Sequence, residues 1–262
     1  MEFILQTKNL HYSIANKELI RDISLDIPRG SFVGLIGPNG SGKSTLLKTI
    51  YRVNKASSGS VYINGKDIER MSNREVARKM AVVTQENDIN FDFSVMEMMM
   101  IGRYAHRSIL ANRDVDDEAI CRKALAMVGM QDFEKRSFLT LSGGEKQRVF
   151  IASAFSRNTE LVVLDEPTNH LDVGYQFQIM DLMKSQKNIT VFAAVHDMNI
   201  AMQYCDYIIA LNGGEVVSVG KPKEVLTTEL LSDLFRVRAE ICETSDGKGY
   251  IRYLGAMTES MK

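Results

Sequence analysis

Short runs of consecutive apolar residues recur along the chain, and segments with a helical period separate them. The runs are rich in β-branched residues, which is typical of strands buried on both faces of a parallel sheet. They lie at residues 32–36, 81–84, 160–166 and 189–195. Helical patterns begin at residue 45 and cover residues 73–80 and 173–184. This alternation predicts an α/β core.

The N-terminal part has another pattern. Residues 2–10 and 19–27 have the character of extended segments, and residues 60–65 form a third one that ends in an Asn-Gly turn. We expect these segments to form a small antiparallel sheet beside the core. Tyr12 is expected in the loop between the first two strands, where it can stack on an adenine ring or be an ordinary half-buried aromatic residue.

The C-terminal part predicts two hairpins and a helix. Residues 207–211 and 215–219 flank Asn212-Gly213-Gly214, a strong hairpin signal. Residues 223–236 have the pattern of one amphipathic helix, and residues 241–254 that of a second hairpin.

From about residue 87 to residue 157 the pattern is helical. Ser94 and Glu97 form a capping box before Met98, Met99, Met100 and Ile101. These methionines fit either core filling or a soft surface that packs against a partner helix. Residues 116–128 predict a further helix with Ile120, Ala124, Met127 and Val128 on one face.

Composition narrows the class of protein. The chain has 262 residues, of which 45% are hydrophobic and 25% charged, as in ordinary soluble globular proteins. The net charge is −1, so the chain has no excess of positive charge that would favour binding to nucleic acid. Cys121, Cys205 and Cys242 are scattered, which fits a reducing compartment and buried apolar roles.

No signal-peptide pattern opens the sequence, and no apolar run approaches the ~20 residues needed to span a bilayer. Any membrane role is therefore expected to come through a partner.

The strongest motif follows the strand at residues 32–36. It matches the phosphate-binding P-loop pattern G-x-x-x-x-G-K-[ST], with a helix after it as the motif requires. Its residues are Gly37, Pro38, Asn39, Gly40, Ser41, Gly42, Lys43, Ser44 and Thr45. Backbone N–H groups and the helix N-terminus favour phosphate, Lys43 can reach the β- and γ-phosphates, and the Ser44 hydroxyl can bind Mg²⁺. The chain is predicted to bind a nucleoside triphosphate.

Further candidate residues stand at element ends. Ser142, Gly143 and Gly144 open a long helix, with Glu145 completing a capping box, so this N-terminus is a second potential anion site or simply a helix cap. The strand at residues 160–166 ends in Asp165 and Glu166, a pair suited to Mg²⁺ and to an attacking water. Gln85 and His196 each follow a strand, where such residues contact ligands or are ordinary loop and cap residues.

Taken together and in this order, these motifs resemble the ATP-binding subunit of an ATP-binding cassette (ABC) transporter over residues 1–230. The resemblance implies a P-loop (RecA-like) α/β core, an N-terminal antiparallel β subdomain and an inserted α-helical subdomain. The expected core with its β subdomain is residues 1–86 and 158–230, the helical subdomain residues 87–157, and the C-terminal tail residues 231–262. ATP and Mg²⁺ are the implied ligands.

The resemblance also implies a role for each matching residue. Tyr12 stacks on adenine; Lys43 and the loop amides hold the phosphates; Ser44, Gln85 and Asp165 serve Mg²⁺ and water. Glu166 acts as the general base, and His196 holds the γ-phosphate and water in line. Ser142, Gly143 and Gly144 bind the ATP of a second copy in a head-to-tail dimer. Lys43, Gln85, Glu166 and His196 are thus the expected catalytic set.

The implied partners are integral-membrane permease subunits and, indirectly, a substrate-binding protein, without nucleic acid. We expect the protein at the cytoplasmic face of the cell membrane. Gly102-Arg103 and His106, with the loop at residues 169–172, resemble the subfamily that serves iron-siderophore, haem and cobalamin import. The alternatives are an ATPase for another cargo or for export, and a non-transport ABC ATPase acting on ribosomes or DNA.

Overall fold

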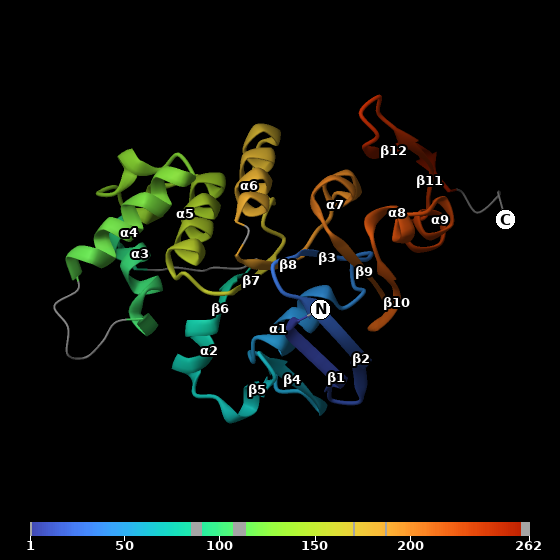
Figure 1. The fold of residues 1–262 in the computed structure, drawn as a ribbon, viewed down its shortest axis with the longest axis horizontal. Coiled ribbons are helices and arrows are strands. Elements are labelled where there is room, and N and C mark those ends of the chain that lie inside the picture. The colour runs from blue at the N-terminus through green and yellow to red at the C-terminus, as the bar shows by residue number, and fades with distance from the viewer. Residues whose placement is uncertain (1, 85–90, 107–113, 170, 187, 258–262) are drawn as a thin grey trace. The chain divides into compact units, whose positions relative to one another are not determined.

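The structure is a computed structural model that describes residues 2–84, 91–106, 114–169, 171–186 and 188–257. Figure 1 shows the helices and strands of the chain, and internal contacts divide the chain into two compact units. The first unit consists of Met1–Asp67 and Phe192–Lys262, and the second of Ile68–Val191. The three-part division expected from the sequence stays a prediction.

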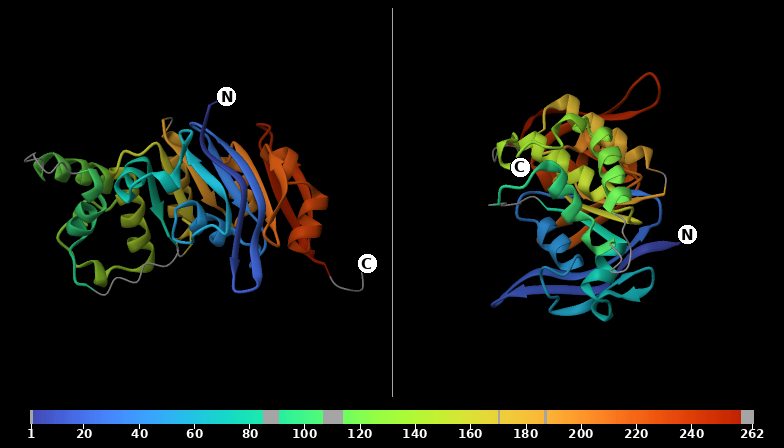
Figure 2. Two further views of the ribbon diagram at one scale, coloured as in Figure 1. Left: turned by 90° about the horizontal axis from the view of Figure 1, so that it is seen from below. Right: turned by 90° about the vertical axis from the view of Figure 1, so that its left-hand side faces the viewer.

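The first unit opens with a four-stranded antiparallel sheet (Figure 2). The strands, in the order β2-β1-β4-β5, are β1 (Phe3–Ile14), β2 (Lys17–Pro28), β4 (Ser58–Ile63) and β5 (Lys66–Asp67). The predicted antiparallel sheet is thus confirmed, but the loop position of Tyr12 is wrong. Tyr12 lies within β1 opposite Ile20, because β1 continues to Ile14 through register shifts on both sides of Tyr12.

The strand before the P-loop, β3 (Phe32–Ile36), is buried at every residue. It pairs in parallel with β9 (Tyr207–Asn212), and β9 pairs with β10 (Glu215–Gly220) as the predicted hairpin. The order in this part of the sheet is β10-β9-β3-β8, with β8 at Thr190–Ala194. Helices α1 (Lys43–Ile50) and α7 (Met198–Tyr204) follow β3 and β8 in the chain, so both begin at the carboxyl ends of parallel strands.

The helix predicted at residues 223–236 is in fact two helices, α8 (Pro222–Val225) and α9 (Thr228–Phe235). Leu226 leaves the helical conformation, and the Thr227 hydroxyl accepts the Leu230 N–H as a new N-cap. The second hairpin is confirmed as β11 (Val237–Glu243) and β12 (Gly249–Ala256).

The second unit contains the parallel pair β6 (Met80–Val83) and β7 (Leu161–Asp165). Helix α2 (Asn73–Lys79) precedes β6, and α6 (Val173–Ser185) follows β7. Strand β7 is fully buried, as its apolar sequence predicts. Short 3₁₀ turns lie at Ile68–Arg70, Tyr104–His106, Gln131–Phe133 and Phe138–Thr140.

Helices α3 (Val95–Gly102), α4 (Asp114–Met127) and α5 (Gly143–Ser156) pack together in this unit (Figure 1). The capping boxes of Ser94 and Ser142 are both present. The predicted buried face of α4 is partly wrong, since Met127 is exposed while Cys121 and Leu125 are buried. The methionines of α3 divide: Met99 is buried, whereas Met98 lines a surface cavity. Among the described residues, no helix has the length and apolarity needed to cross a membrane.

Candidate functional site

The P-loop is a tight backbone turn between β3 and α1. A Cβ at Gly37 would lie 2.3 Å from the Leu211 carbonyl oxygen, so only glycine fits against β9 there. Gly42, the N-cap of α1, has φ 104°, a left-handed conformation that glycine adopts without a Cβ penalty. The Gly214 N–H donates to the Ser41 carbonyl at 2.9 Å and ties the loop to the β9–β10 hairpin. The sequence therefore folds into a loop that β9 and its hairpin hold in shape.

Lys43 and Ser41 supply the buried polar atoms of this loop. Lys43 is only 5% exposed, and its Nζ donates to the carbonyls of Gly37 at 2.7 Å and Pro38 at 3.1 Å. Ser41 Oγ is buried and has no hydrogen-bond partner among the described residues. Ser44 and Thr45 are half-buried in the first turn of α1. A buried cation, an orphaned hydroxyl and a helix N-terminus are a donor set that fits a phosphate chain.

His196 follows β8 in the same unit. The Val195 N–H donates to the Leu35 carbonyl at 3.0 Å, two residues before Gly37, so His196 and the P-loop leave neighbouring strands at the same edge. His196 is exposed, and Asp197 caps α7 by accepting the N–H groups of Asn199 and Ile200. Tyr12 is half-buried in β1 of this unit. The first unit thus holds the P-loop, Tyr12 and His196.

Asp165 and Glu166 lie in the second unit at the carboxyl end of β7. Asp165 is the last residue of the strand and is 1% exposed. Glu166 has φ 57°, a left-handed conformation that costs a residue with a side chain roughly 1–2 kcal/mol. The Asn169 side-chain amide donates to Glu166 Oε2, and the Asn169 N–H donates to the Glu166 carbonyl at 3.2 Å. The turn therefore imposes an uncommon conformation on Glu166 and holds its carboxylate.

The second potential anion site is a cavity of about 410 Å³ at the N-terminus of α5. Its lining is Ser142, Gly143, Gly144, Glu145, Arg148, Leu171, Asp172 and Tyr175. The Ser142 N–H donates to Glu145 Oε2 at 2.7 Å, which lowers the pKa of the Glu145 carboxyl. Glu145 is thus part of the helix cap, and the backbone N–H groups of Gly143 and Gly144 remain at the cavity.

Arg148 is a residue of this cavity whose role the sequence did not indicate. It is 8% exposed and stacks 4.0 Å from the Tyr175 ring centroid, and in the part of the chain that the structure describes its buried Nε has no hydrogen-bond partner. The sequence signal that could have indicated Arg148 is its position. It is a charged residue one turn after the capping box, on the buried face of α5. A buried guanidinium beside a helix N-terminus favours an anionic ligand.

The structure places the predicted residues in two groups. The first unit carries the P-loop, Tyr12 and His196, and the second carries Asp165, Glu166 and the α5 N-terminus. Gln85, predicted to serve Mg²⁺ and water, lies outside the described residues.

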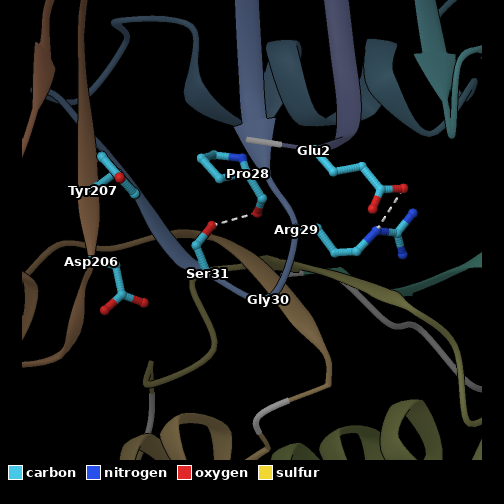
Figure 3. Close-up of a pocket in the computed structure, with 7 residues that line it drawn as sticks. All are labelled: Glu2, Pro28, Arg29, Gly30, Ser31, Asp206 and Tyr207. Atoms are coloured by element: carbon cyan, nitrogen blue, oxygen red, sulfur yellow. Dashed lines mark hydrogen bonds and ion pairs between the residues drawn. The ribbon is translucent and has the colours of Figure 1, made fainter.

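Another pocket, of about 520 Å³, lies at the opposite end of β3 from the P-loop (Figure 3). Glu2, Arg29, Ser31 and Asp206 are among its lining residues. The five residues of β3 separate this pocket from Gly37 by about 17 Å of strand. Arg29 pairs with Glu2 at 3.3 Å, and Asp206 accepts the Phe32 N–H at 2.8 Å, so these charged groups hold the chain entering β3. This pocket is therefore separate from the P-loop.

The fold and these residues define a P-loop nucleotide-binding protein. The family described as ABC transporter matches residues 20–169, more than half of the chain. The iron(3+)-hydroxamate import ATP-binding protein FhuC of Bacillus subtilis is 38% identical over 90% of this chain and 89% of its own length.

Two solved structures are also similar. A metal-chelate type ABC transporter in an inward-facing conformation has a TM-score of 0.81 and 25% identity, over 97% of this chain and 98% of the other. A dimeric post-hydrolysis ATP-binding cassette bound to ADP and Pi has a TM-score of 0.73 and 29% identity, over 84% of this chain and 99% of the other. The chain belongs to the ABC transporter family and is an ATP-hydrolysing subunit within it.

Proposed function

We propose that this protein powers the import of a metal chelate through a membrane permease, with two copies of the chain enclosing the ATP. The main support for an import function is the sequence similarity to an iron(3+)-hydroxamate import protein. This similarity extends over about nine tenths of both chains. The similarity to a metal-chelate type transporter supports the same class of cargo. The protein would act at the cytoplasmic face of the membrane, attached through the permease.

The P-loop half binds the nucleotide. Lys43 Nζ exchanges its carbonyl partners for the β- and γ-phosphates, and the loop N–H groups hold the phosphate oxygens. Tyr12 stacks on the adenine. Ser44, Gln85 and Asp165 would hold Mg²⁺, and the ion would supply positive charge to neutralise the charge that develops on the phosphates. Oxygen donors are the ligands that Mg²⁺ prefers, so Ser44 and Asp165 fit it by chemistry.

Glu166 acts as the general base for the attacking water. Its strained φ and its contact with Asn169 support this role, because strain that a turn imposes on one carboxylate is common at functional sites. His196 holds the γ-phosphate and the water in line. This positioning supplies most of the catalysis in phosphoryl transfer, where the protein contributes little covalent chemistry.

The α5 half binds the ATP of the second copy. Ser142, Gly143 and Gly144 present N–H groups and a hydroxyl, and Arg148 adds a buried positive charge. A chain with a complete P-loop has no internal need of this second anion site. A related cassette is dimeric after hydrolysis, which supports a sandwich of two copies.

The permease would dock on the cavity between α2, α3, α5 and the turn at Tyr104–His106. This cavity has a volume of about 360 Å³ and includes Met98, Ile101, Tyr104 and Phe150 in its lining. Tyr104 is 76% exposed and Ile101 52%, so two large, largely apolar side chains are exposed at its rim. An apolar helix of a permease loop fits such a hollow.

The test is ATP-driven uptake of labelled ferric hydroxamate by proteoliposomes that contain this chain with its permease and binding protein. Tyr104→Ala is expected to reduce uptake at least about tenfold, because interface aromatics often contribute 2 kcal/mol or more. ATP hydrolysis by the free subunit is expected to stay unchanged.

Leu139→Ala is the matched control, since Leu139 is an exposed apolar residue of the same unit outside the cavity lining. Equal loss of uptake in both variants would argue against this docking surface. Uptake of no metal chelate by the wild-type complex would refute the proposed cargo class.

A further inference from the structure

The C-terminal hairpin is hydrogen-bonded to α7, the helix that begins two residues after His196. The clamp is the side chain of Asn199. Its Nδ2 donates to the Ile251 carbonyl at 3.2 Å, and its Oδ1 accepts the Ile251 N–H at 2.7 Å. Asn199 thus bonds both backbone groups on the outer edge of β12, as a neighbouring strand would do. The Ile251 side chain is 3% exposed, so the clamp adjoins a packed contact.

One further close approach and one charge interaction involve the residues of β12 two positions before and after Ile251. A Cβ on Gly249 would lie 3.2 Å from Met202 Sδ, so the strand approaches the C-terminal half of α7 closely. At the other end, burial and then the nearby Asp197 carboxylate raise the pKa of the Tyr253 hydroxyl. Residues 249 and 251 of β12 therefore lie along α7.

The N-terminus of α7 determines where His196 stands. The last strand hydrogen bond before it joins Val195 to Leu35, and the first residue of α7 is Met198. Only His196 and the N-cap Asp197 lie between these two fixed points. A displacement of α7 is therefore passed directly to His196.

We propose that the hairpin Val237–Ala256 is a brace that positions His196 for ATP hydrolysis, and that Asn199 is the positioning residue through which it acts. This inference rests on the proposed role of His196. It assigns a catalytic contribution to a C-terminal segment that lies outside the matched family region of residues 20–169. Positioning of this kind affects turnover more than nucleotide affinity, because the P-loop supplies the binding contacts.

The test measures ATP hydrolysis by the purified full chain as a function of ATP concentration. Asn199→Leu keeps the side-chain shape and removes both hydrogen bonds. We expect kcat to fall roughly tenfold, with KM for ATP within about twofold of wild type, since small misplacements can cost up to 10²-fold in rate. Hydrogen exchange at the Ile251 amide should accelerate while β8 stays protected.

The matched control is Arg252→Ala. Arg252 is the next residue of β12, points to the other face, and pairs with Glu240 at 3.1 Å in an exposed contact. Its loss is expected to leave kcat unchanged. If Asn199→Leu does not fold, Asn199→Asp retains the acceptor for the Ile251 N–H but sets a carboxylate oxygen against the Ile251 carbonyl oxygen. A fall in kcat is expected with this variant as well.

A double-mutant cycle with His196→Ala separates the possible outcomes. The brace is supported if His196→Ala lowers kcat and Asn199→Leu adds nothing in that background. Normal kcat for Asn199→Leu beside an impaired His196→Ala overturns the brace and leaves the proposed function standing. Full activity of His196→Ala overturns the role of His196 itself and the brace with it. Equal effects of Asn199→Leu in both backgrounds also overturn the brace.

Discussion

Replacing Asp117 with asparagine is expected to destabilise the second unit by about 3–5 kcal/mol. Arg103 Nη2 lies 2.6 Å from Asp117 Oδ1, and Arg103 Nε donates to the same oxygen at 2.7 Å. The two side chains are only 8% and 9% exposed, so water cannot replace the lost carboxylate. Asparagine would leave a buried guanidinium with neutral acceptors alone, among them the Ser156 carbonyl. For a chain of this length the loss corresponds to a fall in Tm of roughly 6–20 °C.

The assay is thermal and urea unfolding of the full chain, with hydrogen exchange to locate the effect in α3, α4 and α5. Glu118→Gln is the control on the same helix. It breaks the Arg122–Glu118 pair, whose side chains are 51% and 44% exposed and whose expected contribution is about 0.3–0.5 kcal/mol. The double variant Arg103→Met with Asp117→Leu should recover at least half of the loss, because apolar replacement removes both buried charges. A loss for Asp117→Asn no larger than that of Glu118→Gln would refute the reasoning.

Two other substitutions test the proposed catalytic carboxylate and a half-buried histidine. Glu166→Gln is expected to retain ATP affinity and lose at least about 10²-fold in kcat, measured by calorimetry and phosphate release, whereas near-normal turnover would contradict a general base. Burial, followed by the charge of Arg103, lowers the pKa of His106 from its ordinary 6.5. Its neutral form therefore contributes stability that is complete above pH 6.5 and is lost as the pH falls through 6.5 toward the lower folded-state pKa. His106→Gln should flatten this dependence in urea titrations between about pH 7 and about pH 5, and an unchanged slope would exclude His106 as its source.

Local patterns in the sequence predicted most elements of the fold. The P-loop strand, both capping boxes and both C-terminal hairpins needed only short-range signals and were found. The predicted elements were wrong at positions where contacts with other parts of the chain determine the local structure. Tyr12 is held in β1 by irregular pairing with β2, and the break at Leu226 depends on the competing N-cap at Thr227.

The candidate site shows the same limit. Motif spacing identified the glycines and Lys43, because phosphate binding needs those residues together in sequence. The pairing of Asn199 with Ile251, 52 residues apart, and that of Arg103 with Asp117 depend on contacts between separate elements. No periodicity in the sequence encodes them. The buried Arg148 carried a weak signal, a charge on an apolar helix face, which is meaningful only once the cavity is known.

The contact of Lys43 with the Gly37 and Pro38 carbonyls has a consequence for nucleotide exchange. A buried ammonium without acceptors would make every departure of product strongly uphill, and the nucleotide would become a permanent structural part of the protein. In the proposed function, the two loop carbonyls accept the Lys43 hydrogen bonds again when the product leaves, so release exchanges one set of acceptors for another. The same exchange lowers the affinity for incoming ATP, since its phosphates must compete with two carbonyls for the Lys43 ammonium. The loop thus lowers nucleotide affinity and allows faster product release, which an ATPase that repeats its cycle requires.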